Sequence, residues 1–187
     1  MTSKYLIKNV EVSGVLSDIA IENETITAIG ANLKSDGATE FDFTGSVALP
    51  GLVDLHTHLR EPGKEDAETV LSGSQAAARG GFTAVSAMAN TSPVADTAGV
   101  VEQVYRLGQS AGLVDVFPIG AVTQGIQGEH LAEIGAMADS AARVRVFSDD
   151  GNCVFDPLVM RRALEYVKKF DGVIAQHAQE PRLTQAS

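Results

Sequence analysis

The apolar residues of this chain change their spacing near residue 50, and the change predicts two regions. Between residues 4 and 48, short apolar runs alternate with turn-forming Gly, Asn, Ser and Asp residues, a pattern typical of β-strands joined by tight turns. We therefore expect a small antiparallel sheet with strands at 5–7, 10–12, 19–21, 26–29 and 47–49. Such a sheet is too small to hold a substantial core of its own.

From residue 51 onward, apolar runs of strand length alternate with stretches of helix length. Strands are expected at 51–56, 82–88, 114–120, 144–148 and 173–177, with helices at 66–79, 97–111, 128–141 and 156–170. This alternation is typical of an α/β fold with a parallel sheet. We therefore predict two domains, an N-terminal β segment over 1–50 and an α/β region over 51–187.

Composition and charge narrow the class of protein. The hydrophobic fraction of 44% and the charged fraction of 20% are those of a globular protein. The formal net charge of -10 argues against a nucleic-acid partner, because such proteins present basic surfaces. Cys153 is the single cysteine, so no intrachain disulfide can form. The N-terminus lacks the apolar core of a signal peptide and no apolar run is long enough to span a membrane, so we expect a cytoplasmic protein.

Two histidines follow the first predicted strand of the α/β region at alternate positions. Residues i and i+2 of a strand point to the same face, so His56 and His58 should project side by side from the strand's carboxyl end. Imidazole is a common ligand of divalent transition metals. A pair of structural histidines is the alternative, but the chain has only four histidines and two of them share this motif. Arg60 continues the alternation and would place a planar, bidentate cation beside the metal, suited to a carboxylate.

Two later strands also end in potential ligands. Alternation places Asp149 and Asp150 on opposite faces, so that one carboxylate points to the site and the other away. His177 ends the last predicted strand. Taken singly, the Asp-Asp-Gly run is typical of a turn and His177 of a structural residue. Parallel strands present their carboxyl ends at one edge, however, which is where barrel enzymes place their sites. The predicted zinc ligands are therefore His56, His58, Asp150 and His177.

Three further residues carry chemistry outside that set. Asn90 follows the second strand of the α/β region, and its amide can both donate to and accept from a substrate, although a simple turn explains its position equally well. Cys153 lies close enough in sequence to be a ligand, but a reduced structural thiol is the better interpretation. His130 lies in a polar helical stretch and is predicted to be a surface residue.

Together, these residues make the chain resemble the class I dihydroorotases of the amidohydrolase superfamily. The matching segments are PGLVDLHTHLREPG (50–63), SGSQAAARGGFTAV (72–85), MANTSPVADT (88–97) and FSDDGNCV (147–154). They occur in the family's order and span most of residues 50–180. One departure is Ala89, where the family commonly has a proline, a residue that restricts the backbone φ angle.

The resemblance implies a metal-dependent (β/α)8 TIM-type barrel preceded by a small N-terminal β-sandwich segment. It also implies the reversible conversion of N-carbamoyl-L-aspartate to L-dihydroorotate in pyrimidine biosynthesis, with two zinc ions in a complete site. Many relatives bridge their metals with a carboxylated lysine, but no Lys lies in 144–150 of this chain.

The resemblance also implies roles for individual residues. His56 and His58 would bind one zinc, His177 would bind the second, and Asp150 would be the carboxylate that reaches the metals. The residues expected to hold the substrate carboxylate are Arg60 and Asn90.

Length and family together suggest a partial barrel. A complete barrel takes roughly 250 residues, and the region after Pro50 accounts for about five of its eight strands. We therefore expect a truncated barrel, inactive alone, with the family's general acid/base Asp beyond residue 187. A half-barrel completed by another chain, and a non-catalytic partner of aspartate carbamoyltransferase, are alternatives. So is a hydantoinase or allantoinase, although Arg60 and the missing bridging lysine favour dihydroorotase. A small-molecule substrate, a homo-oligomer and an association with aspartate carbamoyltransferase are the partners expected.

Overall fold

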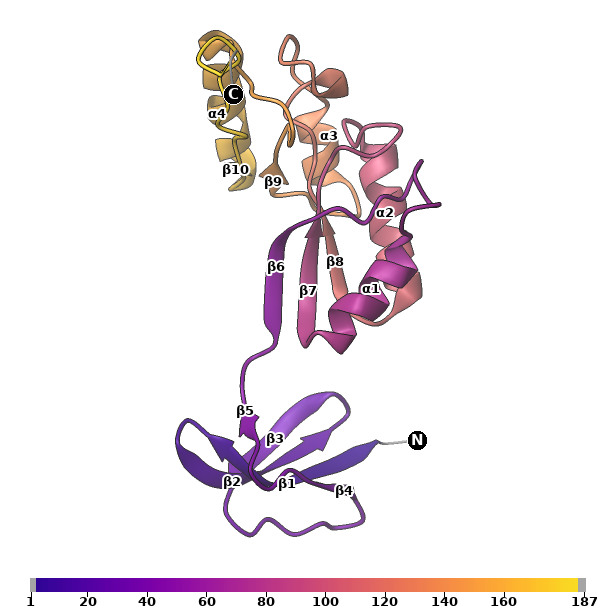
Figure 1. The fold of residues 1–187 in the computed structure, drawn as a ribbon, viewed down its shortest axis with the longest axis vertical. Helices are drawn as coiled ribbons and strands as arrows, with labels where there is room; N and C mark the ends of the chain where they lie inside the picture. Colours follow the sequence, from indigo (N-terminus) through magenta and orange to yellow (C-terminus); the bar gives the residue numbers. More distant parts are fainter. Residues whose placement is uncertain (1–2, 185–187) are drawn as a thin grey trace. The chain divides into compact units, whose positions relative to one another are not determined.

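The structure is a computed structural model that describes residues 3–184. The chain divides into two compact units, Met1–Pro50 and Gly51–Ser187. The first unit is built from β-strands, and the second combines strands with helices (Figure 1).

The first unit is a mixed β-sheet with the strand order β3-β2-β1-β4, in which β5 also pairs with β1. β1 (Lys4–Val12), β2 (Val15–Glu22) and β3 (Thr25–Gly30) form antiparallel pairs, whereas β4 (Thr39–Asp42) and β5 (Val47–Ala48) run parallel to β1. The predicted antiparallel sheet is therefore correct for β1, β2 and β3 and wrong for the edge at which β4 and β5 join β1. The connection at 31–38 crosses from the β3 edge to the β1 edge, so β4 keeps the direction of β3 and therefore runs parallel to β1.

A buried carboxylate holds that crossing connection in place. Asp18 is only 4% exposed, and its two oxygens accept from the backbone N–H groups of Asn9 and Leu33, each at 3.0 Å. The pairing of β1 with β2 is interrupted between Ile7 and Val10, so the N–H of Asn9 is free to bind a side chain. Buried carboxylates are stable only when their oxygens are hydrogen-bonded in this way.

The strands of the second unit are parallel and follow chain order. β6 (Leu52–Thr57), β7 (Phe82–Ala87) and β8 (Asp115–Pro118) lie side by side, and β9 (Val146–Phe147) pairs with β10 (Val173–Ile174). A parallel bridge between Gly120 and Phe147 connects the two groups. Pro118 is the last residue of β8, and the following residue, Ile119, donates its N–H to Ala87 at 2.8 Å. The proline therefore costs the sheet no hydrogen bond at this point.

The helices lie between these strands along the chain. They are α1 (Val70–Arg79), α2 (Ala98–Ala111), α3 (Ile134–Asp139) and α4 (Pro157–Val167), with short 3-10 helices η1 (Gln124–Ile126) and η2 (Lys168–Phe170). α1 packs on β7, and α2 packs on β8 and on α1. Figure 1 shows α1 and α2 on the same side of β7 and β8.

Two helices differ from their predicted extents for local reasons. α1 begins at Val70 instead of residue 66, because Thr69 and Ser72 form a reciprocal capping box. The helix expected over 128–141 is reduced to α3, because the chain pairs with itself ahead of it. The N–H of Gln124 donates to the carbonyl of His130, and the N–H of Ala132 donates to the carbonyl of Val122, both at 2.9 Å.

The core of the second unit consists of two apolar clusters. One cluster lies among α1, α2, β7 and β8 and includes Val70, Val85 and Val104. The larger cluster joins α2, α3, α4 and β9 and includes Phe147, which is fully buried. Gly120 lies against this cluster, and a Cβ atom there would come within 3.0 Å of the Phe147 ring. The absence of a side chain therefore allows the bridge that joins β8 to β9.

Within residues 3–184, no helix is both long enough and apolar enough to cross a membrane.

We expect Phe147→Ala to lower the free energy of unfolding of the second unit by ~3–5 kcal/mol, because it leaves a cavity in the core. Urea denaturation followed by far-ultraviolet circular dichroism measures this unit, because the helices of the described residues all lie in it. The matched control is Phe117→Ala, whose side chain is 52% exposed, and it should cost about 0.5 kcal/mol. Equal losses in the two variants would contradict a core role for Phe147.

Candidate metal centre

The carboxyl end of β6 presents the two histidines of the His-Thr-His motif. His56 lies on the strand, His58 lies just beyond its last residue, Thr57, and the Nε2 atoms of the two imidazoles are 3.3 Å apart. Thr57 secures the strand end to β7, because its hydroxyl donates to the carbonyl of Ser86 at 2.8 Å and its own carbonyl accepts from Met88 at 2.9 Å. The alternation predicted from the sequence therefore brings both rings to one point.

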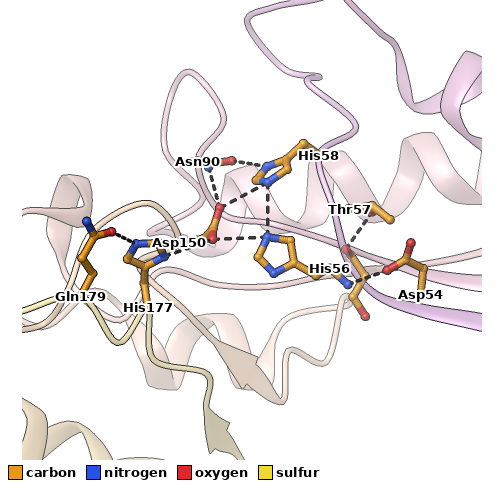
Figure 2. A network of polar contacts seen from close by, with 9 residues as sticks. Asp54, His56, Thr57, His58, Asn90, Asp150, His177 and Gln179 are labelled. Carbon is orange, nitrogen blue, oxygen red and sulfur yellow. Dashed lines mark hydrogen bonds and ion pairs between the residues drawn. The ribbon is translucent and has the colours of Figure 1, made fainter. Parts of the chain in front are cut away.

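Asp150 completes a triangle of potential ligand residues with the two histidines. Its Oδ1 lies 3.3 Å from Nε2 of His56, and its Oδ2 lies 3.4 Å from Nε2 of His58. Asp150 is only 8% exposed. Figure 2 shows the carboxylate lying between the imidazoles. The three groups offer ligand atoms that all lie within 4.8 Å of one another, and they could hold a metal ion.

The direction of Asp150 depends on its neighbour, Asp149. Asp149 is 1% exposed, and its Oδ1 accepts from the backbone N–H groups of Val122 at 2.8 Å and Thr123 at 3.0 Å. Its Oδ2 accepts from the hydroxyl of Thr123, which itself accepts from the N–H of Gly128 at 2.9 Å. The two carboxylates thus point in opposite directions, as alternation along the chain predicts.

Burial raises the pKa of the Asp149 carboxyl, while the hydrogen bonds from Thr123 and Val122 act in the opposite direction. The same residue also closes the turn that carries Asp150, because its carbonyl accepts from the N–H of Asn152 at 2.7 Å. Asp149 is therefore a structural residue that joins the loop after β8 to the turn after β9.

His177 approaches the same carboxylate from the segment just beyond β10, which is the fifth strand described in the second unit. Its Nδ1 lies 3.9 Å from Oδ1 of Asp150, and its Nε2 lies 3.0 Å from Oε1 of Gln179. The segment is tied to the Asp150 loop by Gln176, whose amide donates to the carbonyl of Val154 at 3.1 Å and accepts from its N–H at 3.3 Å. His177 is therefore close to Asp150 but outside the compact triangle.

Asn90 lies within the cluster, between His58 and Asp150. Its Oδ1 is 3.0 Å from Nδ1 of His58, and its Nδ2 donates to Oδ2 of Asp150 at 3.0 Å (Figure 2). The residue before it, Ala89, is fully buried, and its carbonyl accepts from Ala95 at 3.0 Å. This hydrogen bond fixes the turn at Asn90 although the chain has alanine there in place of the family's proline.

Arg60 does not continue the strand alternation. β6 ends at Thr57, and the backbone of Arg60 is left-handed, with φ 60°. Within residues 3–184 its guanidinium takes part in no hydrogen bond or ion pair with another side chain, and the residue is half-buried. The loop that carries it is joined to the Asn90 loop, because Ser92 donates its N–H to the carbonyl of Pro62 at 3.0 Å. Gly63 permits this approach, since a Cβ atom there would lie 2.1 Å from the carbonyl oxygen of Ser92.

The remaining candidates lie outside the triangle. His130 is exposed, as predicted, although it lies in a loop and not on a helix. The sulfur of Cys153 accepts a hydrogen bond from Gln176 at 3.2 Å and is not part of the metal-capable group. The sequence interpretation missed the supporting residues Thr123, Gln176 and Gln179, which belong to no motif and are recognised only by the groups they contact.

Comparison with known proteins identifies the family of the chain. The family model described as Dihydro-orotase-like matches residues 45–187. A dihydroorotase of Streptomyces coelicolor is 63% identical over 99% of this chain and 44% of its own length. A dihydroorotase of Leifsonia xyli is 70% identical over 91% of this chain and 39% of its own length. The chain belongs to the dihydroorotase-like family, and it spans about two fifths of the length of these curated relatives.

Solved structures support the α/β fold. An L-hydantoinase (dihydropyrimidinase) from Arthrobacter aurescens superposes with a TM-score of 0.81 at 21% identity, over 100% of this chain and 43% of its own. A dihydroorotase structure superposes with a TM-score of 0.66 at 13% identity, over 96% of this chain and 52% of its own. At these identities the likeness concerns the fold alone.

Removing the hydroxyl of Thr123 tests the hydrogen bonds around Asp149. Thr123→Val keeps the shape of the side chain but leaves a buried carboxylate oxygen without its donor, and should lower the free energy of unfolding by ~1–3 kcal/mol. The same urea titration measures this loss. Thr83→Val is the control, because the hydroxyl of Thr83 is exposed and donates to Leu52 at 3.3 Å. Equal unfolding free energies for wild type and Thr123→Val would show that this hydroxyl does not support the buried carboxylate.

Proposed function

We propose that this chain forms part of a zinc-dependent dihydroorotase, which interconverts N-carbamoyl-L-aspartate and L-dihydroorotate. The observation that carries the proposal is the triangle of His56, His58 and Asp150 at the ends of parallel strands, in a chain whose curated relatives of 58–70% identity are named dihydroorotases. We assign residues 51–187 to a (β/α)8 barrel and residues 1–50 to a β-sandwich segment. The parallel strand order from β6 to β10 supports the first assignment.

The spacing of the donor atoms fits zinc. Tetrahedral zinc with bonds of about 2.0–2.1 Å separates its ligand atoms by about 3.3–3.4 Å. The Nε2 atoms of His56 and His58 are 3.3 Å apart, and they lie 3.3 and 3.4 Å from the two different oxygens, Oδ1 and Oδ2, of Asp150. Imidazole nitrogens with one carboxylate also form a donor set that zinc prefers.

We propose two zinc sites that share Asp150. His56 and His58 would serve the first, and His177 the second, because its Nδ1 faces the Oδ1 atom of the same carboxylate at 3.9 Å. A carboxylate has two oxygens with several lone pairs, so one group can serve two cations. Asp150 would then take the place of the bridging lysine found in many relatives.

Bound zinc would supply Lewis-acid polarisation of the ring amide and lower the pKa of a water molecule. The protein would orient the substrate, which can lower the activation free energy by several kcal/mol. We assign this to Arg60, whose guanidinium is free of partners within residues 3–184 and whose fork matches a carboxylate. Asn90 is the second candidate, because one N–H of its amide remains available beyond the bond to Asp150.

The proposed function also implies a substrate, a cellular compartment and protein partners. A small cyclic amide is the substrate, and the cytoplasm is the compartment that the single cysteine favours. We also propose a homo-oligomer and an association with aspartate carbamoyltransferase, both on the basis of the family resemblance.

The zinc affinity of single variants should distinguish the two histidines of the proposed site, His56 and His58, from the surface residue His130. We expect the purified chain to bind zinc, and His56→Ala and His58→Ala to weaken the affinity at least about tenfold, because each variant removes a ligand. His130→Ala is the control, since that residue is exposed and outside the cluster. Isothermal titration calorimetry and metal analysis of the intact protein measure the affinity and stoichiometry. Equal losses in all three variants would contradict the assignment.

Substrate choice tests the activity. In the Streptomyces relative, the matched segment, 44% of its length, can be replaced by this chain. We expect the chimera to hydrolyse dihydroorotate and neither hydantoin nor allantoin. In the chimera, Arg60→Lys should raise KM for dihydroorotate, because lysine keeps the charge but loses the bidentate fork. A preference for hydantoin would contradict the proposed substrate, and an unchanged KM would exclude Arg60 as the carboxylate ligand.

A further inference from the structure

Asn90 is placed to control the histidine that it touches. Its amide lies between two proposed ligands, with Oδ1 at 3.0 Å from Nδ1 of His58 and Nδ2 at 3.0 Å from Oδ2 of Asp150. Figure 2 shows Asn90, His58 and Asp150 as a closed loop of contacts, because Nε2 of His58 is also 3.4 Å from the carboxylate. Each polar group of the asparagine side chain therefore has a partner in the cluster.

The chemistry of these partners determines where the protons lie. A carboxylate oxygen only accepts hydrogen bonds, so the NH2 group of Asn90 must face Asp150 and its oxygen must face His58. An amide oxygen also only accepts, so Nδ1 of His58 must carry a hydrogen. In a neutral imidazole this leaves the lone pair on Nε2, which is the nitrogen that lies 3.3 Å from Nε2 of His56.

We propose that Asn90 is a positioning residue that selects the Nδ1–H tautomer of His58 and orients the Asp150 carboxylate, so that both groups direct lone pairs at one metal. This inference rests on the proposed function in one respect, the assignment of His58 and Asp150 as metal ligands. It goes beyond a role for Asn90 in holding substrate, because it acts before any substrate binds. Hydrogen-bond partners of metal ligands often fix the tautomer of a ligating histidine in this way.

Without Asn90, the Nε2–H tautomer of His58 would become the more stable one. Nε2 then faces the Asp150 carboxylate at 3.4 Å, and a hydrogen on Nε2 would be attracted to that acceptor. The lone pair would move to Nδ1, on the opposite side of the ring from His56. The same substitution would remove the donor that holds Oδ2 of Asp150.

Three variants of the full chain separate these effects. Asn90→Ala removes both contacts. Asn90→Asp keeps an acceptor for Nδ1 of His58 but places a carboxylate beside Asp150, so the tautomer should survive while the orientation of Asp150 is lost. Asn152→Ala is the control, because this asparagine lies on the Asp150 turn and donates to Ile126 at 3.1 Å without touching the histidines.

The first measurement needs no metal. Nitrogen-15 NMR of the imidazoles in the zinc-free chain, at a pH where they are neutral, should report Nδ1–H at His58 in wild type, Asn90→Asp and Asn152→Ala. Asn90→Ala should show Nε2–H or a mixture of the two tautomers. If Asn90→Ala keeps the Nδ1–H tautomer, the proposal is overturned, whatever the zinc affinity.

The second measurement is zinc affinity by calorimetry. Asn90→Ala should weaken binding by about 10–100-fold, the usual loss when a partner of a metal ligand is removed, and Asn90→Asp should weaken it less. Asn152→Ala should retain the wild-type affinity. An unchanged affinity in Asn90→Ala would overturn the proposal and leave a substrate contact as its remaining role. Failure of the wild type to bind zinc would instead contradict the proposed function, while the tautomer measurement would still decide the role of Asn90.

Discussion

The hydrogen bonds received by the buried carboxylate of Asp149 are the interaction on which the site depends. Asp149 joins the loop after β8, through Val122 and Thr123, to the turn after β9. Because successive residues of an extended chain point in opposite directions, anchoring Asp149 in the interior directs Asp150 toward the strand ends. The energetic cost of burying one carboxylate is offset by three donors, and the result is a second carboxylate held in a defined direction.

Asp150 itself is less fully compensated. It is 8% exposed and faces the imidazoles of His56, His58 and His177, with Asn90 as its amide donor. The amide carries no charge, and a carboxylate that is largely removed from water is stabilised by an opposite charge. A bound divalent cation would provide that charge. Asp149 therefore holds the turn that carries Asp150, and a cation would stabilise the Asp150 carboxylate. Both features are expected of a metal site.

Sequence patterns predicted the second unit best where local signals were strong. α2 extends from Ala98 to Ala111 against an expected 97–111, because the backbone is extended at Thr97 and left-handed at Gly112, which ends the helix. The helix expected over 128–141 is shorter than predicted, because its first half forms a hydrogen-bonded turn instead. That turn depends on contacts with Val122. The parallel pairing of β4 and β5 with β1 also escaped prediction, since strand direction follows from the path of a connection and not from residue spacing.

The sequence by itself determined the identity and spacing of the principal groups: the i, i+2 pair His56 and His58, the carboxylate Asp150 and the later His177. Their periodicity is a local property of a strand end, so it is readable without a fold. Only the tertiary structure decided which of these groups lie close enough together that they could hold one metal ion, and it placed Asn90 between His58 and Asp150. It also separated Arg60 from the strand alternation, through a left-handed backbone just beyond β6. Such contacts join residues far apart in the chain, and spacing along a sequence carries no information about distances across a sheet edge.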